Sequence, residues 1–254
     1  MADGTQPLIS IITVNLNQAE KLKLTLESVH NQSFDNKEHI VIDGGSTDKS
    51  VEVIKTFDNR LAHWESTTDR GIYDAMNKGL SVAKGQWIHF LNAGDAYTNS
   101  NALSEIAENL DKAYAIIYCD VMLKGIDNSM KVWIQKPAFR FGLFNNICHQ
   151  AVFYNTRQYP DLEFDTRFEI SADAQKLLEI GSRKGWQTFR KIPGPFVIYE
   201  EEGLSFKKAF KALEAREEHF QKWLKNPLLK WLNRLNLKRQ KQKYLRKAKS
   251  GQND

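Results

Sequence analysis

The sequence has few cysteines, no long hydrophobic run and no leader-like beginning, and each absence excludes a class of protein. Its two cysteines, Cys119 and Cys148, lack the spacing of a zinc site and indicate reduced thiols. The first residues lack a basic stretch followed by an apolar core, so we expect no signal peptide. No apolar run approaches the roughly 18 residues that a membrane-spanning helix needs. We therefore expect a cytoplasmic protein.

Acidic residues are absent from one C-terminal block, residues 225–249, which contains ten lysines and arginines. The whole chain has 36 basic and 31 acidic residues, so the rest of the chain has 26 basic and 31 acidic residues and a net negative charge. Such a block predicts an anionic partner, such as a membrane surface. The rest of the chain lacks basic residues interleaved with stacking aromatics, so we expect no nucleic acid partner.

Strand and helix patterns alternate through the first hundred residues of the 254-residue chain. Runs rich in β-branched residues over 8–14 and 39–42 predict buried parallel strands. Amphipathic patterns over 19–31 and 73–83 predict helices between strands. This alternation is typical of right-handed βαβ units. The predicted fold class is therefore α/β, a mostly parallel sheet flanked by helices.

The second half of the chain has a less regular pattern. We expect a strand over 115–119 to form a hairpin with 131–134. The remaining predictions are strands over 150–154, 186–192 and 196–199 and a helix over 171–180. Beyond residue 205 the chain is amphipathic, and Pro227 predicts a break between two helices. The predicted domains are 1–205 and a basic helical appendage over 206–254.

Polar residues follow two of the predicted strands. Asp43 ends the run 39–42, and the tetrapeptide 92–95, Asn-Ala-Gly-Asp, ends the apolar run 87–91. Open α/β sheets bind ligands at the carboxyl ends of their strands. An aspartate there beside an asparagine suits a hard divalent cation that bridges to phosphate oxygens. The alternative is an ordinary turn, because these residue types are common in turns.

Four motifs occur in order along the first half: IITVNLN at 11–17, VIDGGSTD at 41–48, DRGIYDAMNKG at 69–79 and LNAGD at 91–95. Together they resemble the family 2 glycosyltransferases, which have the GT-A nucleotide-sugar-binding fold. The resemblance divides the domain into a nucleotide-binding half, 1–100, and an acceptor half, 101–205.

The resemblance implies an inverting glycosyltransferase, of the hexosyl or N-acetylhexosaminyl type. It would move a sugar from a UDP-sugar to a glycan or lipid-linked acceptor in cell-surface polysaccharide biosynthesis, with Mg²⁺ or Mn²⁺ as its cofactor. A cation would stabilise the negative charge that develops on the leaving nucleoside diphosphate.

Carried over residue by residue, the resemblance implies a donor site at the strand ends. The residues that would border the nucleotide sugar are Thr13, Asn15, Asp43, Gly45, Asp69, Arg70, Asn77, Asn92, Ala93 and Gly94. Thr13 and Asn15 would line the nucleoside pocket, Asp43 would accept a hydrogen bond from the base, and Asp95 would be the metal ligand. Many relatives begin this last motif with an aspartate where this chain has Asn92, so we expect weak metal binding until the donor arrives.

The acceptor hydroxyl loses a proton as it attacks, and a carboxylate is a suitable base. The resemblance places this base on a helix in the second half, where Asp173 is the best match. Glu169 and Asp165 are the alternative candidates for the base. The alternative is that Asp173 is a first-turn residue that complements the helix dipole.

His149 and Gln150 resemble a short motif of bacterial relatives and would shape the acceptor or phosphate region. The alternative for His149 is a structural hydrogen-bonding role.

An apolar stripe is predicted on the helix after Pro227. Its members have helical spacing: Leu228, Trp231, Leu232 and Leu235. Tryptophan beside lysine and arginine suits the interface of an anionic bilayer. The hypothesis is peripheral attachment of 226–249 to the inner face of the plasma membrane. The alternative is a helix packed on the domain with a solvated basic end.

Two rival functions belong to the same fold. A sugar nucleotidyltransferase would carry a glycine-rich basic loop after the first strand, where this chain has the residues 15–18, Asn-Leu-Asn-Gln. A nucleotide-sugar-binding relative without transferase activity is favoured by Asn92.

Overall fold

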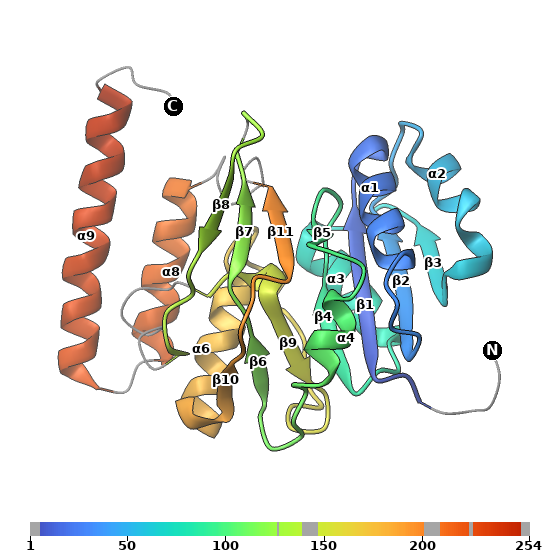
Figure 1. Cartoon of the computed structure of the whole chain (residues 1–254). Coiled ribbons are helices and arrows are strands. Elements are labelled where there is room, and N and C mark those ends of the chain that lie inside the picture. Colours follow the sequence, from blue (N-terminus) through green and yellow to red (C-terminus); the bar gives the residue numbers. More distant parts are fainter. Residues whose placement is uncertain (1–5, 126, 139–146, 201–208, 224–225, 250–254) are drawn as a thin grey trace.

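The computed structural model describes residues 6–125, 127–138, 147–200, 209–223 and 226–249 of the chain (Figure 1). The boundary predicted at residue 205 lies outside the described residues. No helix in the described part of the chain combines the length and the apolar composition of a membrane-spanning segment. The two cysteines are buried and not joined to each other, as expected.

A seven-stranded sheet forms the centre of the molecule, with the order β10-β6-β9-β4-β1-β2-β3. Its strands are β1 (Ile9–Asn15), β2 (Lys37–Asp43), β3 (His63–Ser66), β4 (Trp87–Phe90), β6 (Ile116–Tyr118), β9 (Val152–Asn155) and β10 (Phe189–Lys191). β9 pairs antiparallel with both of its neighbours, and the other pairs are parallel. The predicted mostly parallel α/β sheet is thus confirmed.

Helices cover both faces of this sheet because its strands are apolar on both sides. The α-helices of the described residues are α1 (Ala19–His30), α2 (Ser50–Thr56), α3 (Ile72–Val82), α4 (Ala102–Ala107), α6 (Ala172–Lys184), α8 (Ala209–Trp223) and α9 (Pro227–Lys249), of which α8 and α9 lie beyond α6. Ile12 and Val14 of β1 share a buried cluster with residues of α3 and α6, whereas Ile11 shares one with residues of α1 and α4. Alternate residues of a strand point to opposite faces, which explains this division.

A second, four-stranded sheet has the order β5-β11-β7-β8. Its strands are β5 (Ala96–Tyr97), β7 (Val121–Lys124), β8 (Met130–Trp133) and β11 (Val197–Glu200). The predicted hairpin is wrong in its first arm, because β8 pairs antiparallel with β7 and not with β6. The chain leaves the main sheet after Tyr118 and starts a separate strand at Val121, so β6 pairs with β9 and β10 instead.

The described residues also contain three short 3₁₀ helices: Asp58–Arg60, His149–Ala151 and Trp186–Thr188. The last two occupy the first residues of the strands predicted over 150–154 and 186–192. These strands therefore begin later than expected.

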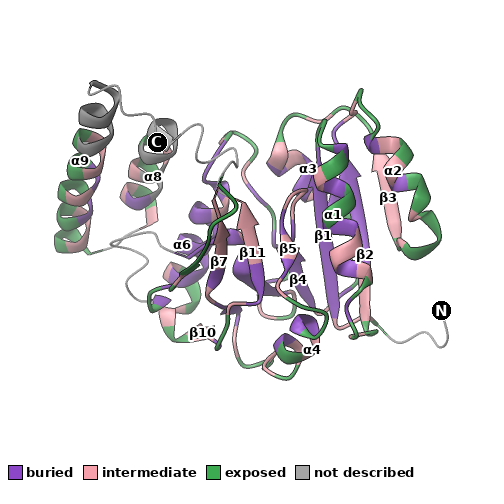
Figure 2. Cartoon of the chain, turned by 45° about the horizontal axis from the view of Figure 1, so that its top comes forward, coloured by how far each residue is buried: buried purple, intermediate pink, exposed green. Residues whose placement is uncertain are grey.

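The C-terminal helices pack along one side of the molecule, α8 against α6 and α9 against α8 (Figure 1). Pro227 is the first residue of α9, which confirms the predicted break. Asn233 and Leu237 are buried, and Leu229 packs against the main core. The predicted apolar stripe lies on the other side of α9. Leu228, Trp231, Leu232 and Leu235 are 60%, 57%, 38% and 36% exposed. Figure 2 shows exposed residues along α9.

Candidate active site

The strands β1 and β2 end side by side at the carboxyl edge of the main sheet. Asn15 and Asp43 are register partners, and Asn15 Nδ2 donates a hydrogen bond to Asp43 Oδ1 over 2.7 Å. Ser46 donates to the same carboxylate through its backbone N–H over 2.9 Å and through its hydroxyl over 2.5 Å. Ser66 Oγ, at the end of β3, donates to Oδ2 over 2.6 Å. Asp43 therefore joins three strand ends.

The Asp43 carboxyl group is fully buried. Burial opposes its ionisation, but the hydrogen bonds from Ser46, Ser66 and Asn15 outweigh burial and lower its pKa. A further hydrogen bond from a nucleotide base stays a prediction. Asn15 Oδ1, buried beside Asp43, has no hydrogen-bond partner among the described residues.

Thr13 and Gly45 hold neighbouring backbone segments close together. Thr13 is fully buried, and its hydroxyl donates to Leu91 O over 2.8 Å and lies 2.9 Å from His39 Nε2. Gly45 has a φ of +80°, and a Cβ there would lie 3.1 Å from Thr68 N. Thr13 thus links β1 to the end of β4, and Gly45 lets the loop after β3 approach the loop after β2.

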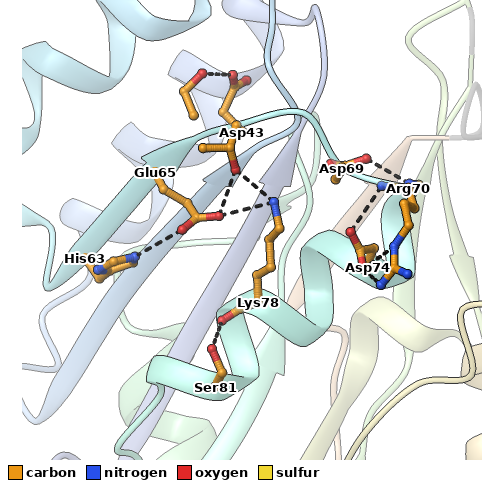
Figure 3. Close-up of polar contacts among 11 residues, drawn as sticks. Asp43, His63, Glu65, Asp69, Arg70, Asp74, Lys78 and Ser81 are labelled. Atoms are coloured by element: carbon orange, nitrogen blue, oxygen red, sulfur yellow. Dashed lines mark hydrogen bonds and ion pairs between the residues drawn. The ribbon is translucent and has the colours of Figure 1, made fainter.

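The segment before α3 lies over the Asp43 turn. Asp69 Oδ1 accepts a hydrogen bond from Gly71 N over 2.8 Å, and a Cβ on Gly44 would come within 2.5 Å of Asp69 Oδ2. Arg70 pairs with Asp74 over 2.8 Å, and its side chain is 80% exposed (Figure 3). The structure therefore brings Asp69 to the Asp43 turn and leaves the Arg70 guanidinium at the surface.

Asn77 lies one turn further along α3. Its side-chain amide makes two hydrogen bonds of 2.8 Å with the backbone of Phe164, one as donor and one as acceptor. Asn77 therefore fastens the segment around Phe164 to α3.

The Asn92-Ala93-Gly94-Asp95 turn follows β4 and is held by α1. Thr25 Oγ1 donates to Asp95 O over 2.7 Å and accepts from Gly94 N over 3.0 Å. Asp95 is only 4% exposed. Burial raises the pKa of its carboxyl group to about 8, against backbone hydrogen bonds from Glu200 and Asn92 that favour ionisation.

These residues do not fit a divalent-cation site. Beside a nucleotide, such a cation needs at least one or two accessible carboxylates in addition to phosphate oxygens and waters. In the described part of the chain, no three histidine, cysteine or acidic side chains converge where they could hold a metal. The Asp95 carboxyl group is enclosed by backbone amides, the side-chain oxygen of Asn92 is buried, and Ala93 and Gly94 offer no side-chain oxygen. The metal-ligand role of Asp95 stays a prediction that this donor set does not support.

The helices α3 and α6 begin close together, where the sequence predicts the acceptor side. Tyr73 Oη, from the first turn of α3, donates a hydrogen bond to Asp173 Oδ1 over 2.7 Å. Tyr73 is buried, whereas Asp173 in the first turn of α6 is half-buried. Ser171, directly before α6, has a φ of +68°. Asp173 therefore has a fixed orientation and a solvent-accessible part, as a general base needs.

His149 is buried inside the protein. Its Nδ1 is 3.2 Å from Tyr154 Oη, and its ring stacks on Phe90. Burial lowers the pKa of His149, while the charge of Asp173 opposes this shift. These contacts favour the structural interpretation of His149.

Gln150 also makes its described contacts within the protein. Its backbone oxygen lies 2.8 Å from His89 Nε2, and Cys148 Sγ donates to its Oε1 over 3.1 Å. A role in the acceptor or phosphate region stays a prediction for both residues of this motif.

Sequence reasoning missed several residues that build the site. Tyr73 lies inside a recognised motif, but no signal assigned it to Asp173, 100 positions away. Lys21 and Thr25 have the i, i+4 spacing of one helix face, which could have indicated a shared target. Glu200 opens an acidic run at 200–202, but no local signal paired it with Lys21.

Comparisons with known proteins identify the family and the fold. The family model described as Glycosyl transferase family 2 matches residues 10–173. A PGL/p-HBAD biosynthesis glycosyltransferase of Mycobacterium bovis is 31% identical over 182 residues, covering 66% of this chain and 67% of its own length.

Two solved structures share the fold. S. aureus TarS 1-349 in complex with UDP-GlcNAc aligns with a TM-score of 0.65 and 17% identity, over 88% of this chain and 69% of its own. The mannosyltransferase PcManGT from Pyrobaculum calidifontis, in complex with GDP-Man and Mn²⁺, aligns with a TM-score of 0.64 and 16% identity, over 90% and 70%. The predicted GT-A architecture is confirmed.

Proposed function

Since this chain belongs to glycosyl transferase family 2 and is a glycosyltransferase, we propose that it transfers a hexosyl or N-acetylhexosaminyl group from a UDP-sugar. The proposed acceptor is a glycan or a lipid-linked sugar of the cell surface. The UDP-GlcNAc in the TarS complex supports the donor class, and the PGL/p-HBAD role in the name of the mycobacterial relative supports the setting. The observation that carries the proposal is Asp173, half-buried and held by Tyr73.

The proposed reaction is a single displacement. The acceptor hydroxyl oxygen attacks the anomeric carbon while the bond from that carbon to the diphosphate oxygen breaks. Asp173 takes the hydroxyl proton, UDP leaves, and the configuration at the anomeric carbon inverts. Tyr73 fixes the direction of the carboxylate, which keeps the base in line with the incoming hydroxyl.

The leaving UDP gains negative charge, which the protein must stabilise. The Mg²⁺ or Mn²⁺ that the family resemblance implies would supply this stabilisation when bound. The residues around Asp95 do not fit such an ion, so no step is assigned to it.

Nucleotide-sugar binding can be tested by thermal unfolding, because a ligand that binds only the folded state raises its apparent stability. We expect UDP-sugars to raise the unfolding midpoint and GDP- or CMP-sugars to leave it unchanged, with and without Mn²⁺. If no nucleotide sugar changes the midpoint, the proposed donor class is wrong.

A coupled assay separates the rival functions. Release of UDP that depends on an acceptor supports transfer. Donor binding without UDP release indicates a binding protein, and pyrophosphate release from UTP with a sugar phosphate indicates a nucleotidyltransferase. Unchanged transfer in Asp173→Ala would make the assigned base wrong.

We also propose that α9 attaches the enzyme to the anionic inner face of the plasma membrane. The buried side of α9 packs on the protein through Asn233 and Leu237, so the exposed apolar stripe of Leu228, Trp231, Leu232 and Leu235 lies on another side. The block 225–249 contains ten basic and no acidic residues, which complements anionic lipid.

Vesicle flotation tests this attachment. We expect the protein to float with phosphatidylglycerol vesicles and not with phosphatidylcholine vesicles, and the Trp231→Ser/Leu235→Ser variant to lose flotation. Leu24→Ser is the matched control, because Leu24 is 56% exposed on α1, outside the stripe. Equal flotation of the two variants would contradict the proposal.

A further inference from the structure

One face of α1 lies against the Asn92-Ala93-Gly94-Asp95 turn. Thr25 binds the backbone of this turn, and Lys21 lies one helical turn earlier on the same face. A Cβ placed on Gly94 would lie 3.4 Å from Lys21 Cδ, so the aliphatic part of Lys21 covers the glycine. The φ of Gly94 is +103°, which disfavours a side chain there.

The Lys21 ammonium forms an ion pair with Glu200 Oε2 at the end of β11. Lys124 of β7 approaches the other oxygen of Glu200, with 3.9 Å between Nζ and Oε1. The side chains of Lys21, Glu200 and Lys124 are 32%, 23% and 36% exposed. Two partly exposed ammonium groups thus share one carboxylate at the edge where the donor is proposed to bind.

The charge at this turn suits an anion better than a cation. An ammonium group carries a positive charge and N–H donors, so Lys21 can donate a hydrogen bond to a phosphate oxygen. A lysine also repels a divalent cation, and Gly94 offers that cation no side-chain ligand. The Asp95 carboxyl group lies inside, 4% exposed.

We propose that Lys21 binds the diphosphate of the nucleotide-sugar donor and stabilises the charge that develops on it, the task for which a divalent cation was expected. Glu200 is a positioning residue that holds the ammonium group over the turn. This inference rests on the proposed function, because it assumes a nucleoside diphosphate donor. It predicts that the enzyme binds UDP in the absence of divalent cations.

Calorimetric titration of the full chain with UDP and with uridine, both in EDTA, tests the inference. Lys21→Met removes the charge but keeps an unbranched apolar side chain against Gly94. We expect it to weaken UDP binding about tenfold to a hundredfold, the range for a hydrogen bond to a charged group, and to leave uridine binding unchanged. Lys21→Arg keeps the charge and should restore most of the UDP affinity.

Lys23→Met is the matched control. Lys23 is exposed on the same helix and lies 4.0 Å from Glu27, so its replacement should leave UDP binding unchanged. Unfolding midpoints without ligand establish that all variants are folded.

Three results would overturn the inference. If wild-type protein binds UDP only when Mn²⁺ is added, or if Lys21→Met binds UDP as wild type does, Lys21 does not hold the diphosphate and the proposed transferase function stands. If wild-type protein binds neither UDP nor any UDP-sugar under either condition, the proposed function fails with the inference.

Discussion

The carboxyl edge of the main sheet and the first turn of α6 both present aspartates, but they surround them differently. At the sheet edge Asp43 and Asp95 are 0% and 4% exposed, and both accept hydrogen bonds from the protein. Asp173 at α6 is half-buried and bound by Tyr73. A buried aspartate holds the backbone segments at the sheet edge in place through its hydrogen bonds. A partly exposed aspartate can exchange a proton with a substrate.

The two buried aspartates, Asp43 and Asp95, differ from each other in their hydrogen-bond donors and in their pKa values. Asp43 receives side-chain hydroxyl and amide donors as well as a backbone donor, and its pKa is lowered. Asp95 receives backbone donors from Glu200 and Asn92, and burial raises its pKa to about 8. The number and kind of donors therefore decide which strand-end carboxyl group stays ionised.

The largest expected effect is on the transfer rate, through replacement of the partly exposed Asp173. Asp173→Asn should lower the transfer rate about 10²- to 10⁴-fold, because it removes the base, and should leave the unfolding midpoint nearly unchanged. Asp165→Asn is the control, since Asp165 is paired with Arg167 at 2.5 Å. Acceptor-dependent UDP release measures both. A large loss in Asp165→Asn with full activity in Asp173→Asn would reverse the assignment.

Asp43→Ala should destabilise the protein by about 1–3 kcal/mol, because it leaves buried donors unpaired. Urea unfolding near pH 7 measures this, with the exposed Asp161→Ala as a control within about 0.5 kcal/mol of wild type. The Asp43 pKa is lowered in the folded state, so its stabilisation is present above pH ~4 and is lost as the pH falls through the folded pKa. Equal unfolding of both variants would show that Asp43 is not structural.

Asp95 should show the opposite pH dependence. Its folded pKa of about 8 exceeds the unfolded value of about 3.9, so the folded state binds the extra proton between these limits. Its contribution to stability should then fall by up to about 1.4 kcal/mol per pH unit as the pH rises from about 4 to 8. Asp95→Asn should remove this slope, so its stability relative to wild type should increase between pH 5 and pH 8. Parallel urea-unfolding profiles for the two proteins would contradict the enclosed state of Asp95.

The smallest expected effect is on the residue that holds the base. Tyr73→Phe keeps the ring in the core but removes the hydrogen bond to Asp173, so kcat should fall about threefold to tenfold. KM for the donor should stay close to the wild-type value, because Tyr73 is assigned to the base alone. A change in donor KM with an unchanged kcat would place Tyr73 on the donor side.

The periodicity of consecutive residues predicted the strands and helices of the first half of the fold. It missed features that depend on segments far apart in the sequence. The β-branched runs of β1 and β2 and the amphipathic pattern of α1 are visible in consecutive residues. The two-residue strand β5 and the short strand β7 are held by β11, about 75–100 positions later, so no local periodicity marks their sheet. The same holds for α9, whose pattern showed an apolar stripe without indicating that Asn233 and Leu237 would form the buried side.

The sequence by itself determined the α/β order, the family motifs, the polar residues at the strand ends and Asp173 as the candidate base. These features follow from neighbouring residues, because strand and helix periodicity and turn chemistry are short-range. The tertiary structure decided which aspartates are enclosed, that Tyr73 binds Asp173, and that Lys21 meets Glu200 across 179 positions. Burial, pKa and ion pairing depend on which distant segments pack together, and that packing exists only in the folded chain.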